Sequence, residues 1–147
     1  MTTTTSATAS ATDIDGVEAL CDRWAAAWNA HDPEAVAALC SDDLVYDEPA
    51  LGETAYGRES IREFVALMGR NFPDYSFTRV GLYGEVTRRA VLVAWRFSGT
   101  LAGTDRVVEF HGDDRLELGA DGLVHAYRCL YDNRLVLSQM GRARAAG

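Results

Sequence analysis

The sequence predicts an α+β fold in which three helices pack on one face of a curved antiparallel sheet. Apolar residues recur at helical spacing up to residue 72 and at alternate positions from residue 75 onward. The chain has 147 residues, of which 48% are hydrophobic and 24% are charged, which fits one globular domain with a sizeable core. Because the helices precede the long strands, they are expected to gather on one face of the sheet.

The three helices are read from apolar spacing and capping residues. The first spans residues 13–32 and repeats apolar side chains along one face. The second spans residues 31–40, with Asp32 as its N-cap and Pro33 in its first turn, where the missing N–H breaks no hydrogen bond. The third spans residues 57–72, and its apolar face carries Ile61, Phe64, Val65 and Met68.

Strands follow from a change of the apolar period from 3.6 to 2. A short strand over residues 43–49 ends at Pro49, which cannot donate a hydrogen bond to a sheet. Turns that contain glycine separate the longer strands. These strands are read as an antiparallel meander over residues 75–83, 88–99, 105–118 and 122–132.

The two ends of the chain are expected to lie outside the folded domain. Residues 1–12 form a Thr/Ser/Ala tract that is typical of a disordered tail and lacks the basic and apolar regions of a secretory signal. Residues 142–147 are interpreted as a frayed C-terminal tail. The sequence therefore predicts a single domain over residues 13–141.

Charge and cysteine content restrict the partners and the compartment. The formal net charge of −8 disfavours a nucleic-acid backbone or an anionic membrane as a partner, and no apolar run approaches the roughly 18 residues of a membrane span. Three widely spaced cysteines make no disulfide framework, and reduced thiols indicate a cytoplasmic protein. With three scattered histidines and no glycine-rich phosphate loop, we expect no metal and no cofactor.

One acidic residue interrupts an apolar face in the third long strand. Alternation places Asp114 on the same face as Val108, Phe110 and Leu116. A buried carboxylate that is ionised and unpaired is costly, so this side chain should be neutral, paired or facing a cavity. A bulge after Gly112 would instead shift the register and leave Asp114 in solvent. The pattern alone leaves both interpretations open.

A pair of acids precedes Pro49 in the short first strand. Tyr46 and Glu48 would share one face and Asp47 the other, but both faces are mixed, so alternation does not show which acid points inward. An acid in a surface turn before a proline is the plainer alternative. A carboxylate held in an apolar pocket could instead move protons.

Aromatic residues with polar tips gather on one face of the last strand. Alternation places His125, Tyr127, Cys129 and Tyr131 together there, and Trp95 lies on an earlier strand. Such residues suit the wall of an apolar ligand pocket, and they suit a dimer interface about as well. His125 is either a pocket residue or a histidine with a structural role.

Two segments resemble the ketosteroid isomerase-like and SnoaL-like polyketide cyclase domains of the nuclear transport factor two-like superfamily. They are WNAHDPEAVAALCSDDLVYDEP at residues 28–49 and DGLVHAYRCLYDNRLVLSQMG at residues 121–141. The likeness covers about residues 14–141. It implies a cone-shaped α+β barrel with a deep apolar pocket for a hydrophobic small molecule, and a homodimer.

The resemblance also implies catalytic roles for two carboxyls that share one pocket. Glu48 stands where ketosteroid isomerases carry their proton-shuttling acid, directly before the proline. Asp114 stands where they carry a protonated acid that donates a hydrogen bond to an oxyanion. The implied chemistry needs no cofactor: Glu48 takes a proton from a carbon beside a carbonyl, and Asp114 stabilises the enolate.

Other positions depart from these families. Cys129 stands where limonene epoxide hydrolases carry an acid. Trp24 stands where the isomerases carry a tyrosine that donates to the oxyanion. Four tyrosines could replace that donor, namely Tyr46, Tyr56, Tyr127 and Tyr131.

Together these residues predict an enzyme that isomerises, cyclises or dehydrates a hydrophobic carbonyl compound, such as a polyketide-like biosynthetic intermediate. The alternatives are an epoxide-opening cyclase or hydrolase with the same acid pair, and a binding module without chemistry. The catalytic residues are expected to be Glu48 and Asp114. The substrate is expected to contact Trp24, Tyr46, Trp95, His125, Tyr127, Cys129 and Tyr131.

Overall fold

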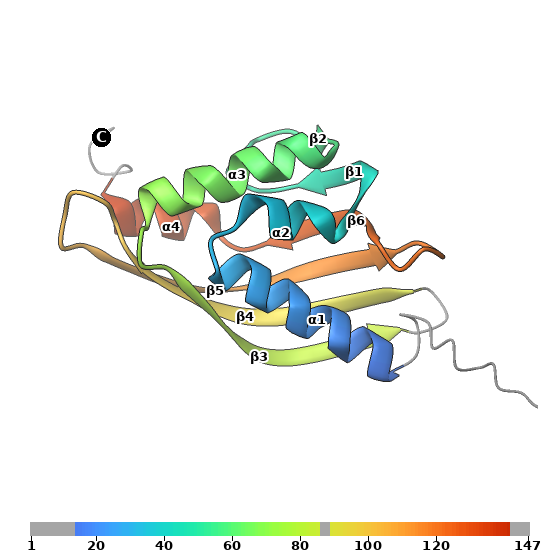
Figure 1. Ribbon diagram of the computed structural model, residues 1–147. Helices are drawn as coiled ribbons and strands as arrows, with labels where there is room; N and C mark the ends of the chain where they lie inside the picture. The colour runs from blue at the N-terminus through green and yellow to red at the C-terminus, as the bar shows by residue number, and fades with distance from the viewer. Residues whose placement is uncertain (1–13, 86–88, 142–147) are drawn as a thin grey trace, which may run out of the picture.

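The computed structural model describes residues 14–85 and 89–141 and confirms the α+β fold. A strongly curved six-stranded sheet carries its helices on one side (Figure 1). The predicted tails at residues 1–12 and 142–147 lie outside the described residues. Within the described ranges, no helix is both long enough and apolar enough to cross a membrane.

Three N-terminal helices form where the apolar spacing predicts them. They are α1 (Ile14–Asn29), α2 (Pro33–Ala38) and α3 (Arg58–Asn71). Asp32 caps α2, because its carboxylate accepts hydrogen bonds from two backbone N–H groups at 3.0 and 3.2 Å. The most buried residues of α1 turn toward the sheet and comprise Leu20, Cys21, Trp24 and Trp28.

A fourth helix, α4 (Asn133–Met140), follows the last strand, where the sequence pattern predicts none. Asp132 caps its start by accepting hydrogen bonds from two backbone N–H groups at 3.0 and 3.3 Å. Gly141 ends it in the left-handed conformation, with φ of 86°. A helix of eight residues needs tertiary packing to be stable, and α4 packs against the sheet (Figure 1).

The strands follow the order β2-β1-β6-β5-β4-β3 across the sheet. The last four strands of this order form the antiparallel meander that the sequence predicts. The strands are β1 (Cys40–Asp47), β2 (Ala55–Tyr56), β3 (Ser76–Glu85), β4 (Ala90–Thr100), β5 (Val107–Leu118) and β6 (Val124–Leu130).

The expectation of a wholly antiparallel sheet is wrong at one junction, because β1 pairs with β6 in parallel. Alternation marks a strand but carries no information on the direction of its neighbour, and β1 does not reach β6 through a hairpin turn. In this register Asp47 lies opposite Arg128. The parallel pairing therefore brings the residue after β1, Glu48, to the end of β6, near Cys129 and the residue that follows the strand, Tyr131.

The register of β5 decides where Asp114 points. β5 pairs with β4 without interruption, from Glu117 opposite Ala90 to Val107 opposite Thr100. No bulge follows Gly112, so the alternation that the sequence shows is kept and Asp114 lies on the inner face of the sheet.

Candidate active site

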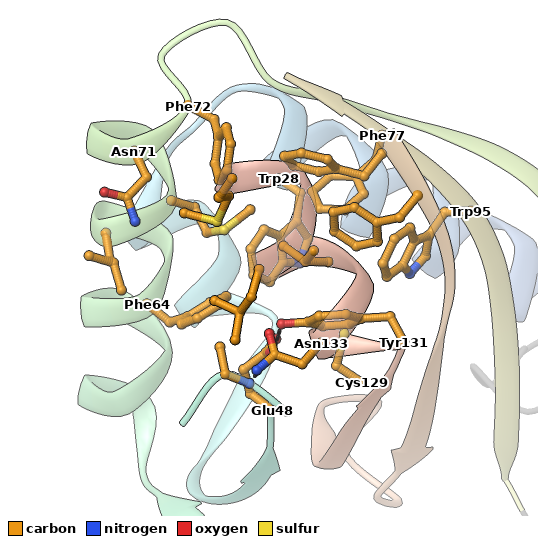
Figure 2. Close-up of a pocket in the computed structure, with 18 of the residues that line it drawn as sticks. Trp28, Glu48, Phe64, Asn71, Phe72, Phe77, Trp95, Cys129, Tyr131 and Asn133 are labelled. Carbon is orange, nitrogen blue, oxygen red and sulfur yellow. Dashed lines mark hydrogen bonds between the residues drawn. The ribbon is translucent and has the colours of Figure 1, made fainter. Parts of the chain in front are cut away.

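A cavity of about 280 Å³ lies between α3, α4 and the inner face of the sheet (Figure 2). Aromatic rings from α1, α3 and every long strand line it, together with methionine and leucine side chains of α3 and α4. A largely apolar cavity with a few polar groups is typical of a small-molecule site. The lining is interrupted by the polar or thiol side chains of Glu48, Asn71, Cys129 and Asn133.

Glu48 lies in this cavity wall and is only 5% exposed. Its Oε2 atom accepts hydrogen bonds from the backbone N–H of Ala50 at 3.0 Å and from the hydroxyl of Tyr131. Its Oε1 atom accepts a long hydrogen bond of 3.4 Å from the hydroxyl of Tyr46, and the Cys129 thiol also lies close enough to the carboxyl to favour its ionised form. Two donors thus fix the orientation of the carboxyl group, and Oε1 is the atom that remains able to bind a proton.

Burial raises the pKa of Glu48 above its ordinary value. The hydrogen bonds from Tyr131 and Ala50 favour the ionised form and partly oppose this rise, while the nearby Asp114 adds to it. A carboxylate with a raised pKa is a stronger base than one in water, which suits proton abstraction near neutral pH.

Asp47, the other acid before Pro49, points away from the cavity. Its carboxylate accepts a hydrogen bond of 2.6 Å from the Thr54 hydroxyl and lies 3.5 Å from the Arg128 guanidinium on the outer side of the sheet. Alternation left the choice between the two acids open, and the structure places Glu48 at the cavity.

Asp114 is 6% exposed but does not line this cavity. The indole N–H of Trp24 donates to its Oδ2 atom and the hydroxyl of Tyr127 donates to its Oδ1 atom, each at 3.0 Å. We expected both carboxyls to line one pocket, but only Glu48 lines this cavity and Asp114 does not. The reason is that Tyr127, from the neighbouring strand, covers Asp114 on the cavity side.

Burial is also the main cause of a raised pKa at Asp114, and the hydrogen bonds from Trp24 and Tyr127 act in the opposite direction. The indole N–H of Trp95 also lies near enough to lower this pKa, but it makes no hydrogen bond of good geometry. The carboxyl group is thus held between donors in a poorly solvated environment, where a bound proton is favoured.

The Cys129 thiol lies beside both carboxyls. Burial raises its pKa well above the ordinary value, and the charges of Asp114 and Glu48 add to the rise. The thiol therefore stays protonated at neutral pH and is a poor nucleophile.

Four of the residues predicted to contact substrate line the cavity, namely Trp95, Tyr127, Cys129 and Tyr131. Trp24 and Tyr46 lie behind it, where each donates a hydrogen bond to one of the two carboxyls.

His125 does not reach the cavity, contrary to expectation. Its Nε2 atom lies 3.0 Å from Asp121 at the hairpin between β5 and β6, and its side chain is partly exposed. The register shifts at this point, so that Glu117 and Leu118 face Ala126 and Val124. His125 is the extra residue of this bulge, and alternation cannot be counted through it.

The sequence reading missed the contribution of α4. This helix supplies four lining residues, Asn133, Val136, Leu137 and Met140. The signals for this helix in the sequence are weak: an N-cap at Asp132 and one i, i+4 pair, Val136 and Met140.

Among the described residues, no group of three or more His, Cys, Asp or Glu side chains is arranged to hold a metal ion. The polar groups that face the cavity are instead a carboxyl, two amides, a thiol and aromatic hydroxyls, which can bind and orient an organic ligand and exchange protons with it.

A helix-covered, strongly curved sheet with a buried acid in an apolar cavity defines the class of protein. The family model of the SnoaL-like domain matches residues 21–127, and the chain belongs to this family. No curated protein is significantly similar to the chain.

Solved structures share the fold. A hypothetical protein with a ketosteroid isomerase-like fold from Catenulispora acidiphila, crystallised with trimethylamine, is 24% identical over 83% of this chain and 92% of its own, with a TM-score of 0.74. A candidate polyketide cyclase from Xanthomonas campestris is 16% identical over 83% and 94%, with a TM-score of 0.74. The epoxide hydrolase/cyclase-like enzyme SalBIII of salinomycin pyran formation is 15% identical over 82% and 94%, with a TM-score of 0.73. At these identities the likeness establishes the fold alone.

Proposed function

We propose that this protein is a cofactor-independent enzyme that uses Glu48 as a general base on a hydrophobic carbonyl compound. The observation that carries the proposal is the state of Glu48: it is buried in an aromatic cavity, two donors hold its Oε2 atom, and Oε1 is nearly free. A fixed base with a raised pKa in a water-poor cavity is what abstraction of a proton next to a carbonyl requires.

In the proposed reaction, Oε1 of Glu48 takes a proton from the carbon next to the carbonyl. The C–H electron pair moves toward the carbonyl oxygen and forms an enolate. Return of the proton from Glu48 to a different carbon completes an isomerisation. Attack of the enolate carbon on a second carbonyl closes a ring, and the alkoxide formed takes the proton from Glu48. Expulsion of hydroxide from the enolate, which takes the same proton and leaves as water, completes a dehydration.

Asp114 acts in this proposal through Tyr127, because the tyrosine lies between Asp114 and the cavity. When Asp114 carries a proton, it donates to the Tyr127 oxygen, and the Tyr127 hydroxyl becomes free to donate to the enolate oxygen. Tyr127 would thus supply the oxyanion donor that Trp24 cannot supply, since the Trp24 indole N–H is bonded to Asp114.

The proposed substrate is a polyketide-like intermediate. Family membership and the structural likeness to a candidate polyketide cyclase and to SalBIII support this class. The aromatic walls of the cavity, which suit flat rings, support it independently.

The test uses 2-tetralone, a hydrophobic bicyclic ketone, as a probe of proton abstraction. In D2O the protein should accelerate loss of the C1 proton signal in NMR spectra, and Glu48→Gln should lower the rate at least 100-fold. Asp114→Leu should lower it less, by about tenfold, because it removes the one hydrogen bond through which Asp114 acts on Tyr127. Equal rates for wild type and Glu48→Gln would end the proposal.

A non-catalytic binding role is the second candidate, and the position of Asp114 outside the cavity lining favours it. The same experiment separates the two functions. Saturable binding of 2-tetralone without accelerated exchange would support a binding module and oppose the enzyme.

A further inference from the structure

The three asparagines of the chain have different surroundings. The Asn29 amide donates to the Phe77 carbonyl at 3.0 Å and accepts from the Phe77 N–H at 2.7 Å, so it ties α1 to β3. Asn71 and Asn133 line the cavity, are half-buried, and make no side-chain hydrogen bond within the described part of the chain. Both amides are only half-buried, so water can pair with them when no ligand is bound, and a ligand that displaces this water must supply the hydrogen bonds itself.

We propose that the cavity binds an elongated apolar molecule that carries a neutral oxygen group at each end, one held by Asn133 and the other by Asn71. The assignment of the Asn133 end as the reacting end rests on the proposed function of Glu48. The two-ended mode of binding does not.

Asn133 is placed by the start of α4. Asp132 caps the helix, which fixes the backbone of the first helical residue, Asn133. Figure 2 shows Asn133 on the same side of the cavity as Glu48 and Tyr131. An amide N–H here can donate to an oxygen of a ligand whose adjacent carbon lies near Oε1 of Glu48.

Asn71 is placed by the end of α3. Its backbone carbonyl accepts a hydrogen bond of 2.7 Å from the N–H of Ala102, which anchors this end of the helix while the side-chain amide stays unpaired. Figure 2 shows Asn71 beside Phe72 at the end of the cavity away from Glu48. The rest of the cavity lining is mainly apolar and includes Phe72, Phe77 and Met68.

The chemistry of the cavity restricts the two end groups. Amides are neutral and both donate and accept hydrogen bonds, so they match hydroxyl or carbonyl groups. The described lining contains no basic side chain, and Glu48 repels an anion, so carboxylate and phosphate ends are disfavoured. A molecule with only one oxygen would leave one amide unpaired and should bind more weakly.

The test compares 2-naphthol with 2,6-dihydroxynaphthalene by isothermal titration calorimetry. The second hydroxyl should tighten binding to the wild-type protein about tenfold. In Asn71→Leu and in Asn133→Leu, the ratio of the affinity for 2,6-dihydroxynaphthalene to the affinity for 2-naphthol should fall to about one, because a single amide remains. The affinity for 2-naphthol itself should stay within about twofold, because its one hydroxyl can still bind the remaining amide. The double variant should also weaken 2-naphthol binding about tenfold.

Val136→Ala is the matched control, since it removes apolar lining and should weaken both probes equally. Thermal melts establish that each variant is folded. A wild-type ratio near one, or an undiminished ratio in Asn71→Leu, would overturn the inference. Its failure is distinguishable from that of the proposed function, because the ratio measures binding and 2-tetralone exchange in wild type and Glu48→Gln measures proton abstraction.

Discussion

Tyr46 and Tyr127 stack with their ring centroids 4.8 Å apart and their planes within 17°, and each donates its hydroxyl to a different carboxyl. Tyr46 donates to Glu48 and Tyr127 donates to Asp114. The parallel pairing of β1 and β6 places the two rings side by side, since Tyr46 lies opposite Tyr127 in the register. The stack therefore links two carboxyls that do not face each other across the cavity.

Replacing Tyr131 by Phe should raise the pKa of Glu48. The Tyr131 hydroxyl donates to Oε2 and favours the ionised carboxylate, so its loss favours the protonated form. Because the base acts when ionised, the acid limb of the pH profile of 2-tetralone exchange should move upward by about one pH unit. Tyr46→Phe is the control and should shift the limb less, since its bond of 3.4 Å is long. An unmoved limb in Tyr131→Phe would contradict the assignment of Glu48 as the base.

Replacing Asp114 by Asn should change how stability depends on pH. Burial raises the pKa of Asp114 in the folded state above its unfolded value of 3.8, so the folded state binds the proton more tightly. In the wild-type protein, ionisation of the buried Asp114 lowers the free energy of unfolding. This loss of stability is absent below the unfolded pKa, grows as pH rises toward the folded pKa, and is complete above the folded pKa. Each unit of pKa difference corresponds to about 1.4 kcal/mol.

Urea unfolding from pH 4 to pH 8 measures this effect. The free energy of unfolding of Asp114→Asn should rise relative to wild type as pH increases, whatever the offset at pH 4. Asp74 and Asp121 have lowered pKa values and opposite slopes, but both proteins contain them and their contributions cancel. Parallel curves for the two proteins would show that Asp114 is ionised at low pH in the folded state.

Alternation marks Asp114 as the one acid on an apolar face, but it leaves a bulge open as an alternative and says nothing of the surroundings of this side chain. Alternation is reliable in β5, because the strand is long and pairs with β4 without a bulge. It fails at His125, where a bulge adds one residue. It also cannot show that Tyr127, from another strand, covers Asp114, because such contacts depend on side-chain packing in three dimensions.

Two features of the fold lie beyond alternation and spacing. The direction of β1 relative to β6 is set by a long connection and not by a hairpin turn. The helix α4 is too short for a strong periodic pattern and depends on packing against β5. The family resemblance supplies the position of Glu48, which periodicity leaves undecided.

Replacing Gly112 by Ala should destabilise the protein and disturb the cavity wall. A Cβ atom there would lie 2.3 Å from Cη2 of Trp95 and 2.9 Å from the Leu130 carbonyl oxygen, so the indole would have to move. Overpacking of this kind costs about 1–3 kcal/mol, or roughly 3–10 °C in Tm for a domain of this size. The measurement is a thermal melt, with Trp fluorescence as a report on Trp95.

Gly69→Ala is the matched control for that substitution. Gly69 lies inside α3, and a Cβ atom would meet nothing within 4 Å. Alanine is the better helix former, so this variant should be more stable by about 0.5–1 kcal/mol. Equal melting temperatures for the two variants would contradict the packing of Trp95 against Gly112.

Replacing Gln139 by Ala should loosen α4 from the sheet. The Gln139 side chain accepts a hydrogen bond of 2.6 Å from the Glu109 N–H and donates one of 2.7 Å to the Glu109 carbonyl. β6 pairs with β5 only from Asp113 to Leu118, so Gln139 satisfies backbone groups of β5 beyond the end of β6. Loss of both bonds should cost about 1–3 kcal/mol and speed amide hydrogen exchange at Glu109. Ser138→Ala, at an exposed neighbouring position, should change neither the stability nor the rate of amide exchange at Glu109. Slow exchange at Glu109 in Gln139→Ala would show that α4 is held by its apolar face alone.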